Sequence, residues 1–257
     1  MWRNVRIAIL LLILGIAAWS NWYDRLSTTD WDETLYIGVF PVDEATNPVA
    51  REYIGHLSAS RIEDIEKFLN AEAHEYGVTI ARPVRVELYP PVLERPPERA
   101  ADANILQTMW WSLKLRMYAR RASRASGKPP PQIRIFVLYH DPNFSQSVPH
   151  SVGLQKGLVG VVHAFADTEM TRSNNVVITH EILHTLGASD KYDPATLAPL
   201  YPIGYAEPDR APRFPQAFTE IMAGRHALDA QTFEIPESLD DVVVGNATAL
   251  EIRWIRK

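Results

Sequence analysis

Residues 174–190 read NNVVITHEILHTLGASD, and the rest of the chain is best interpreted outward from this stretch. His180 and His184 are four positions apart, so a helix places both imidazoles on one face, where they can bind a single metal ion. Glu181 lies one position further round the helix, where its carboxylate can reach a water on that ion without being a ligand. The neighbouring residues are mostly Val, Ile and Leu, which predicts that the helix lies deep in the domain.

A metal site with one open position requires a third protein ligand, and the end of this helix indicates which residue supplies it. Gly187 tolerates the left-handed conformation that ends a helix, so the chain can turn back beneath the histidines. Asp190 then arrives six residues after His184 as an oxygen ligand, with Asp193 as the reserve candidate. The expected metal ligands are therefore His180, His184 and Asp190.

The string from His180 to Asp190 resembles the extended zinc-binding consensus of the metzincin metallopeptidases, H-E-x-x-H-x-x-G-x-x-H/D. Most members end in histidine, so the aspartate here is similar to the snapalysin-type variant. Residues 219–224 read TEIMAG, which is similar to the Met-turn of that family and makes Met222 an apolar floor beneath the metal. The resemblance covers only these two patches. It implies a metzincin-like domain, a zinc cofactor and hydrolysis of peptide or protein substrates.

The resemblance also implies a mechanism, and two alternatives stay open beside it. Zinc polarises the substrate carbonyl and acidifies a water, and Glu181 accepts the proton of that water as general base. The insert between Asp190 and Met222 is long, so one alternative is a gluzincin-like peptidase with Glu207 or Glu220 as third ligand. The other is a non-catalytic binding module that the metal stabilises, and the intact Glu181 argues against it.

Hydrophobic patterns predict the elements around the motif helix. Apolar or alternating runs predict strands at 34–42, 84–89, 133–139 and 157–166. Apolar residues at three- and four-residue steps predict helices at 48–76 and 104–124, the second with Ile105, Met109, Leu113 and Met117 on one stripe. The order of elements, without internal repeats, predicts an α+β (mixed α/β) fold in a single domain with a twisted mixed sheet. By the resemblance, residues 157–166 form the edge strand that pairs with an extended peptide.

The N-terminus reads as a membrane signal. Arg3 and Arg6 precede an uncharged run at residues 7–19, IAILLLILGIAAW, and aromatic residues flank it. With these flanks the run reaches the length of a bilayer span, which predicts a transmembrane signal anchor over residues 1–23. A cleaved signal peptide, with a secreted product, is the alternative. A tether at residues 24–33 and an extracytoplasmic domain at residues 34–257 would follow, with the membrane as a partner through the N-terminal helix.

The composition excludes several classes of function. The 257 residues contain no Cys, which removes disulfides, thiolate zinc sites, iron–sulfur clusters and a cysteine nucleophile. The formal net charge of -5 argues against nucleic acid as a partner. No glycine-rich phosphate-binding motif opens a helix, so nucleotide binding has no support in the sequence.

Overall fold

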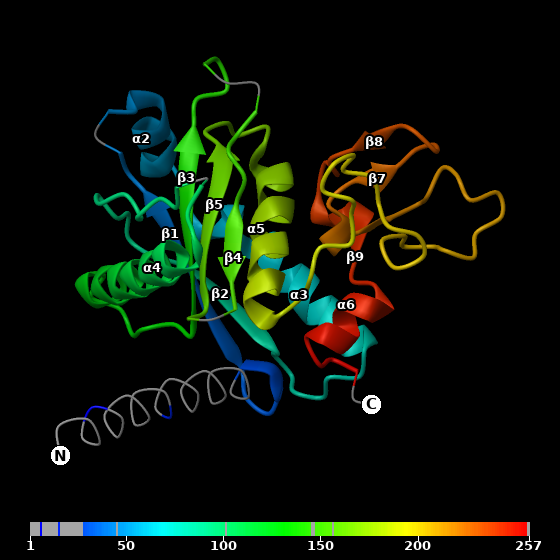
Figure 1. Ribbon diagram of the computed structural model, residues 1–257, viewed down its shortest axis with the longest axis horizontal. Coiled ribbons are helices and arrows are strands. Elements are labelled where there is room, and N and C mark those ends of the chain that lie inside the picture. The colour runs from blue at the N-terminus through cyan, green and yellow to red at the C-terminus, as the bar shows by residue number, and fades with distance from the viewer. Residues whose placement is uncertain are drawn as a thin grey trace.

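The computed structural model describes Arg6, Gly15 and residues 28–44, 46–100, 102–144, 147–155 and 157–255. Its central feature is a five-stranded sheet with the strand order β2-β1-β3-β5-β4 (Figure 1). The strands are β1 (Leu35–Val42), β2 (Val84–Leu88), β3 (Ile133–His140), β4 (Val152–Leu154) and β5 (Val159–Phe165). The pairs β1–β2, β1–β3 and β3–β5 are parallel, whereas β4 runs antiparallel to β5.

The connections between these strands decide between the α+β and the mixed α/β class. Parallel neighbours need crossover connections, and helices supply them: α2 (Pro48–Gly55) and α3 (Glu63–Glu75) join β1 to β2, and α4 (Ile105–Ala125) joins β2 to β3. The central strands β1 and β3 are buried along almost their whole length, as expected of strands that are covered on both faces. The fold is therefore α/β with a mixed sheet, which is the mixed α/β form of the prediction, and it is not α+β.

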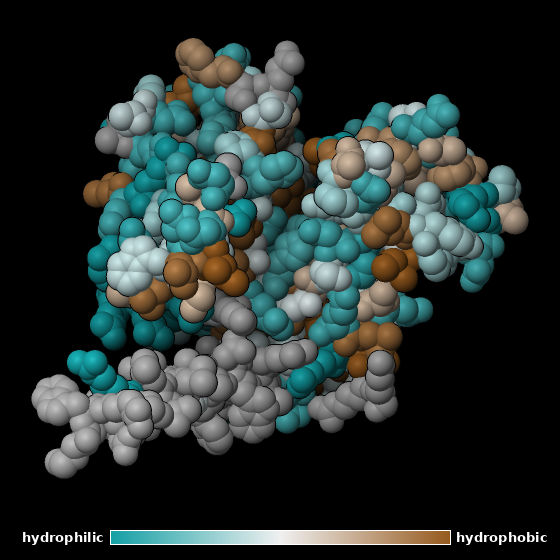
Figure 2. All heavy atoms as spheres, viewed as in Figure 1, coloured by the Kyte–Doolittle hydropathy of each residue, from teal (hydrophilic) through white to brown (hydrophobic). Residues whose placement is uncertain are grey.

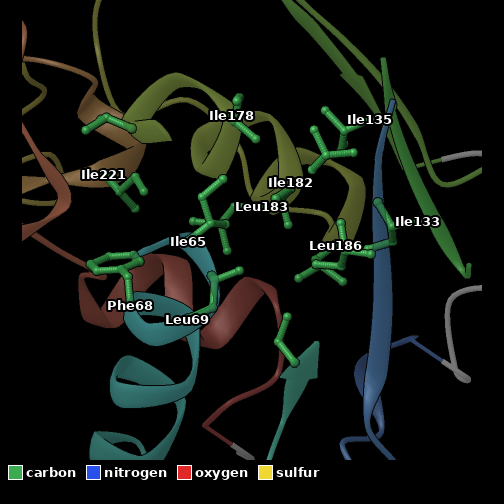
Figure 3. Packing of buried hydrophobic residues seen from close by; sticks show 14 of the residues in the cluster. Ile65, Phe68, Leu69, Ile133, Ile135, Ile178, Ile182, Leu183, Leu186 and Ile221 are labelled. Carbon is green, nitrogen blue, oxygen red and sulfur yellow. The ribbon is translucent and has the colours of Figure 1, made fainter. Parts of the chain in front are cut away.

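The sheet separates two hydrophobic cores. The larger core lies on the face covered by α5 (Thr171–Leu186), α3 and the short C-terminal α6 (Asn246–Glu251). Figure 3 shows this packing, with Leu183 of α5 beside Ile65 of α3 and Leu186 of α5 near Ile133 of β3. On the opposite face α4 packs against the sheet, and Tyr118 lies 4.8 Å from Phe136 between ring centroids. The motif helix α5 is thus held between the sheet and α3.

The chain beyond α5 forms short elements on the side of α5 away from the sheet (Figure 1). These are β6 (Thr219–Glu220), the 3-10 turn η2 (Ile221–Ala223), β7 (His226–Ala227), β8 (Phe233–Glu234), η3 (Leu239–Asp241) and β9 (Val242–Val243). β6 pairs in parallel with β9, and β7 pairs in antiparallel with β8. The long insert expected between Asp190 and Met222 is irregular apart from β6 at its end, and isolated bridges tie it down.

The helix predicted over residues 48–76 is interrupted. α2 ends at Gly55, the 3-10 turn η1 (Ala59–Arg61) follows, and α3 begins at Glu63. The hydroxyls of Ser58 and Ser60 lie 2.8 Å apart across this break. Serine side chains offer local hydrogen bonds that compete with helical hydrogen bonds, and glycine has a low helix propensity. The helix therefore stops in this segment, although the spacing of apolar residues that predicted it continues.

The expectations for the N-terminus are corrected where the structure describes it. Within the described part of the chain, no helix is both long and apolar enough to cross a membrane, against the predicted transmembrane helix. Apart from Arg6 and Gly15, the segment 1–23 lies outside the described residues. In the predicted tether, Trp31 is buried against Trp254 with ring centroids 5.7 Å apart, and its Nε1 donates to the Ile252 carbonyl at 2.8 Å. Residues 28–33 therefore belong to the folded domain, because burial of an aromatic ring of this size stabilises it.

Candidate metal centre

The end of α5 brings the predicted ligands together. The helix ends at Gly187, whose φ of 105° lies in the left-handed region. The backbone amide of Ala188 donates to the Leu183 carbonyl at 3.0 Å, which closes the turn. The chain then reverses and carries Asp190 back to the two histidines. Its Oδ1 lies 3.2 Å from Nε2 of His180 and 3.1 Å from Nε2 of His184.

Hydrogen bonds fix the orientation of both imidazole rings. Nδ1 of His180 lies 2.9 Å from the Ile221 carbonyl, and Nδ1 of His184 lies 2.8 Å from the Ala188 carbonyl. A carbonyl oxygen only accepts hydrogen bonds, so Nδ1 is the protonated nitrogen in each ring. In the neutral tautomer, both Nε2 lone pairs then point toward the Asp190 oxygen. Histidines that ligate metals show this arrangement, with the second ring nitrogen donating to a carbonyl.

The three groups fit a zinc ion. Without a cation between them, the Nε2 lone pairs of two neutral imidazoles and an ionised carboxylate oxygen repel one another. Protonation of an imidazole at Nε2 would remove this repulsion. Burial disfavours a charged His184, but hydrogen bonding to Asp190 and the charge of Glu181 outweigh it and raise the pKa of this imidazole. Two ligands that bind a tetrahedral ion at about 2.0 Å are themselves about 3.3 Å apart, close to the observed Nε2–Oδ1 separations. Two imidazoles and one carboxylate are a donor set that suits zinc.

Glu181 lies beside this cluster without a structural partner for one of its oxygens. One donor atom each from His180, Glu181 and His184 lie within 4.8 Å of one another. The Glu181 side chain is 5% exposed, and its Oε2 is buried with no hydrogen-bond partner among the described residues. Burial raises the pKa of the Glu181 carboxyl, although the two histidines favour its charged form. A backbone hydrogen bond with Gly153 also favours the charged form, so only Oε2 is left without a partner. A buried carboxylate that is only partly hydrogen-bonded is costly and is typical of a functional position.

The turn η2 holds two parts of the cluster through hydrogen bonds to its backbone carbonyls. The Ile221 carbonyl accepts from His180, and the Met222 carbonyl accepts from the Lys191 backbone amide at 2.8 Å. Met222 itself is fully buried in the larger core. The segment that resembles a Met-turn thus fixes one histidine and the backbone next to Asp190.

A buried ion pair anchors the chain next to Asp190. Lys191 is 1% exposed, and its Nζ lies 2.7 Å from Oε2 of Glu251 in α6 and 2.8 Å from the Ser189 carbonyl. Ser189 in turn donates its hydroxyl to Glu251 Oε1 at 2.7 Å. This pair joins positions 60 residues apart, so local sequence patterns gave no sign of it.

We expect Glu251→Ala to lower the free energy of unfolding by about 2–3 kcal/mol, because it leaves the Lys191 ammonium buried without its carboxylate. Adding Lys191→Met removes that charge and should recover part of the loss. Urea unfolding followed by circular dichroism measures both variants. Arg210→Ala, which removes only an exposed pair with Glu207, serves as the control and should change stability by less than about 1 kcal/mol. A double variant less stable than Glu251→Ala would contradict this account.

Gly153 allows β4 to approach Glu181 and the helix α5 closely. Gly153 of β4 is the register partner of Gly160 of β5. A Cβ at Gly153 would lie 2.5 Å from the Glu181 carbonyl oxygen and 2.6 Å from the His184 Cβ. Sequence reasoning did not assign either glycine a role in the site. It also placed the sheet edge at residues 157–166, which was wrong, because β5 is an inner strand and β4 is the edge.

We expect Gly153→Ala to lower any hydrolytic activity by about 100-fold, because the methyl group pushes β4 and Glu181 apart and shifts of about 1 Å have effects of this size. Metal content should fall less than activity, because the new methyl group would lie against only one of the three predicted ligands, His184. Activity assays and metal analysis on the same preparation measure the two effects. Gly55→Ala is the matched control, because a Cβ at Gly55 meets nothing within 4 Å. Equal losses in both variants would contradict the steric role of Gly153.

Tyr192 is a further residue of the site, and it lies in the insert between Asp190 and Met222. Its side chain hydrogen-bonds to the Asp190 carboxylate. Burial and the negative charges of Asp190 and Glu181 raise the pKa of the Tyr192 hydroxyl, so it remains a donor at neutral pH. Such a contact orients a carboxylate ligand from outside the ligand set.

The other candidate ligands are occupied elsewhere. Asp193 Oδ1 accepts from the backbone amide of Ala195 at 2.7 Å within a turn. Glu207 is half-buried and pairs with Arg210. Glu220 is buried, and its oxygens accept from the Thr248 hydroxyl at 2.6 Å and from the backbone amides of Gly245 and Ala223. The geometry around α5 therefore favours Asp190 as the third group.

Comparisons with known proteins do not assign a family. No protein-family model matches the chain, and no curated protein matches it. A solved structure that matches is described as "Structure of a chaperone-substrate complex", with 11% sequence identity and a TM-score of 0.39. The match covers 87% of this chain and 35% of that one, so this chain spans about a third of that structure's length. A likeness this weak carries no argument about function, which has to be argued from the site.

Proposed function

We propose that this chain is a metzincin-like zinc metallopeptidase that hydrolyses peptide bonds in peptide or protein substrates. One observation carries the proposal: the Nε2 atoms of His180 and His184, oriented by their protonated Nδ1 atoms, both lie within 3.2 Å of one Asp190 oxygen. Three metal-binding groups that converge in this way, next to a glutamate on the same helix turn, match the chemistry that the HExxH motif implies.

Each residue of the site has a distinct role in the proposed reaction. His180, His184 and Asp190 would hold the ion, and zinc when bound supplies a Lewis acid for the scissile carbonyl and lowers the pKa of water. Glu181 accepts the proton of the attacking water and delivers it to the leaving amine. Its burial raises the pKa of its carboxyl, which brings it nearer to the range that suits proton transfer at neutral pH.

The edge strand suggests how a substrate would lie. β4 passes directly beside Glu181, because Gly153 touches the helix there, and its outer side is free of strand pairing among the described residues. An extended peptide that adds to this edge would run along the cluster of histidines. The strand proposed to pair with the substrate is therefore β4, in place of the strand predicted at residues 157–166.

The buried Glu181 also supports catalysis over a metal-stabilised binding module. Its Oε2 forms no hydrogen bond with any described residue, and the one backbone hydrogen bond of the carboxylate, with Gly153, offsets only part of the cost of burying it. A binding scaffold would be more stable with an apolar residue at this position. The same cost is expected where a carboxylate is kept to move a proton.

Removal of the metal tests the proposal. The purified full chain is expected to contain about one zinc per chain and to digest a peptide library. We expect 1,10-phenanthroline to abolish the digestion, and added zinc to restore it, because the ion is required for the reaction. The 1,7 isomer, which does not chelate, is the control. A chain without stoichiometric metal, or a digestion that resists chelation, would rule the proposal out.

A further inference from the structure

The outward face of α4 exposes an unusual amount of apolar surface. Six large side chains on its first turns are between 44% and 78% exposed: Ile105, Leu106, Met109, Trp110, Leu113 and Met117. In Figure 2 a brown patch lies at the place that α4 has in Figure 1. The residues on the opposite side of the helix, such as Leu115 and Tyr118, are buried against the sheet. The predicted stripe of α4 is thus turned to solvent, where exposed apolar patches mark interaction sites.

The same helix carries a concentration of positive charge. Its 21 residues include Lys114, Arg116, Arg120, Arg121 and Arg124 but no Asp or Glu, in a chain with a formal net charge of -5. At about 100° per residue, Arg120 and Arg124 fall on the same arc of the helix as the exposed apolar side chains. Both arginines are exposed, and neither has an ion-pair partner among the described residues, whereas Arg121 pairs with Glu94. The outward face is therefore apolar near its start and basic toward its end.

We propose that this face of α4 docks onto a membrane surface rich in anionic lipid. The apolar side chains would enter the boundary between headgroups and acyl chains, and the arginines would contact the lipid phosphates. A protein partner would need a groove shaped for this convex ridge together with carboxylates beside it. A bilayer supplies a deformable apolar layer beneath a negative surface, which matches the arrangement of α4 without further assumptions. Trp110 adds an aromatic ring of the kind enriched at such interfaces.

Docking through α4 has a consequence for the rest of the domain. α4 covers one face of the sheet, and α5 with the candidate metal centre covers the other. A domain bound through α4 would hold the metal centre away from the lipid, facing the aqueous phase. The inference itself does not depend on the proposed peptidase activity, because it rests on α4 alone.

The absence of cysteine from the chain allows a direct test on the full-length protein. A Met109→Cys variant carries a polarity-sensitive fluorophore at one defined point of the face, and an Ile235→Cys variant carries it at an exposed apolar position beyond β8. Each is mixed with vesicles of phosphatidylcholine alone or of phosphatidylcholine with phosphatidylglycerol. We expect a blue shift and brighter emission for the label at position 109 with the anionic vesicles only. The label at position 235 should not respond.

Charge variants distinguish the contribution of the arginines on α4 from an effect of the net charge of the whole chain. Each basic residue near an anionic surface contributes about fivefold to binding, so Arg120→Gln/Arg124→Gln should weaken the response at position 109 about 25-fold. Arg61→Gln/Arg85→Gln removes the same amount of positive charge from exposed positions outside α4 and should leave the response at position 109 unchanged. Equal effects of the two pairs, or equal responses to both kinds of vesicle, would overturn the proposal. So would a response to protein concentration without lipid, which would identify a second copy as the occupant.

Discussion

Glu181→Gln is expected to lower peptide hydrolysis by about 1,000-fold, within the range of 10²–10⁴ that general acid–base catalysis supplies. Glutamine has nearly the same shape as glutamate, but its amide cannot accept the proton of the attacking water. The groups that converge on Asp190 are unchanged in this variant, so zinc should stay bound at about one ion per chain. Steady-state rates on a peptide substrate, with metal analysis of the same sample, measure both effects.

A second glutamate provides the control for this prediction. Burial raises the pKa of Glu72 as well, but this residue lies on α3 and accepts from the Val244 amide. Glu72→Gln should therefore keep the hydrolytic rate within a few-fold of the parent. If Glu181→Gln retained full activity, Glu181 would not be the base, and if it lost the zinc, Glu181 would be a ligand. Either result contradicts the assigned role.

The core of the candidate site could be predicted from the sequence because its geometry is local. The spacing of His180 and His184 fixes their relative position once the segment is a helix, and the apolar residues around them require that helix. Gly187 indicates where the helix ends, and the short distance to Asp190 limits where this carboxylate can lie. Each of these steps uses contacts between residues that are close in the chain.

The residues that the sequence did not reveal depend on contacts between distant segments. Gly153 matters only because β4 pairs with β5 directly beside α5, and no pattern near Gly153 indicates that position. Lys191 is recognisable only when Glu251 of α6 is seen beside it. A short strand such as β4 also lacks enough residues for a periodic signal, so no strand beyond β5 was predicted, and the resemblance placed the sheet edge at β5.

The orientation of α4 illustrates a different limit of sequence patterns. Periodicity identifies an apolar stripe on a helix, but it does not state which side of the helix meets the core. In α4 the side that packs on the sheet combines Leu115 and Tyr118 with the small residues Ala119 and Ala122, which allow close approach. The larger apolar residues lie outside. The sequence could not separate α+β from mixed α/β for a related reason, since the direction of strand pairing is not encoded within any one strand.

The identity of the third ligand has the second-largest expected effect, and Asp190→Ala addresses it. We expect this variant to bind zinc more than about 100-fold more weakly, since losing even a partner outside the ligand set costs 10–100-fold. Asp190 is the carboxylate within 3.2 Å of both imidazoles, so its removal leaves two nitrogens to hold the ion. Hydrolysis should be lost with the metal. Titration with a competing chelator of known affinity measures the change.

Variants of Glu207 and Glu220, the third ligands of the gluzincin-like alternative, show whether the loss of zinc is specific to Asp190. Glu207→Ala should keep zinc and activity, because this carboxylate is paired with Arg210. Glu220→Gln should also keep zinc but lower stability, because the new amide cannot accept from both the Gly245 and Ala223 amides and the Thr248 hydroxyl. Thermal unfolding of each variant without metal separates loss of fold from loss of a ligand. Zinc retained in Asp190→Ala but lost in a folded Glu220→Gln would transfer the third position to Glu220, and the role of the chain reversal at Gly187 would have to be abandoned.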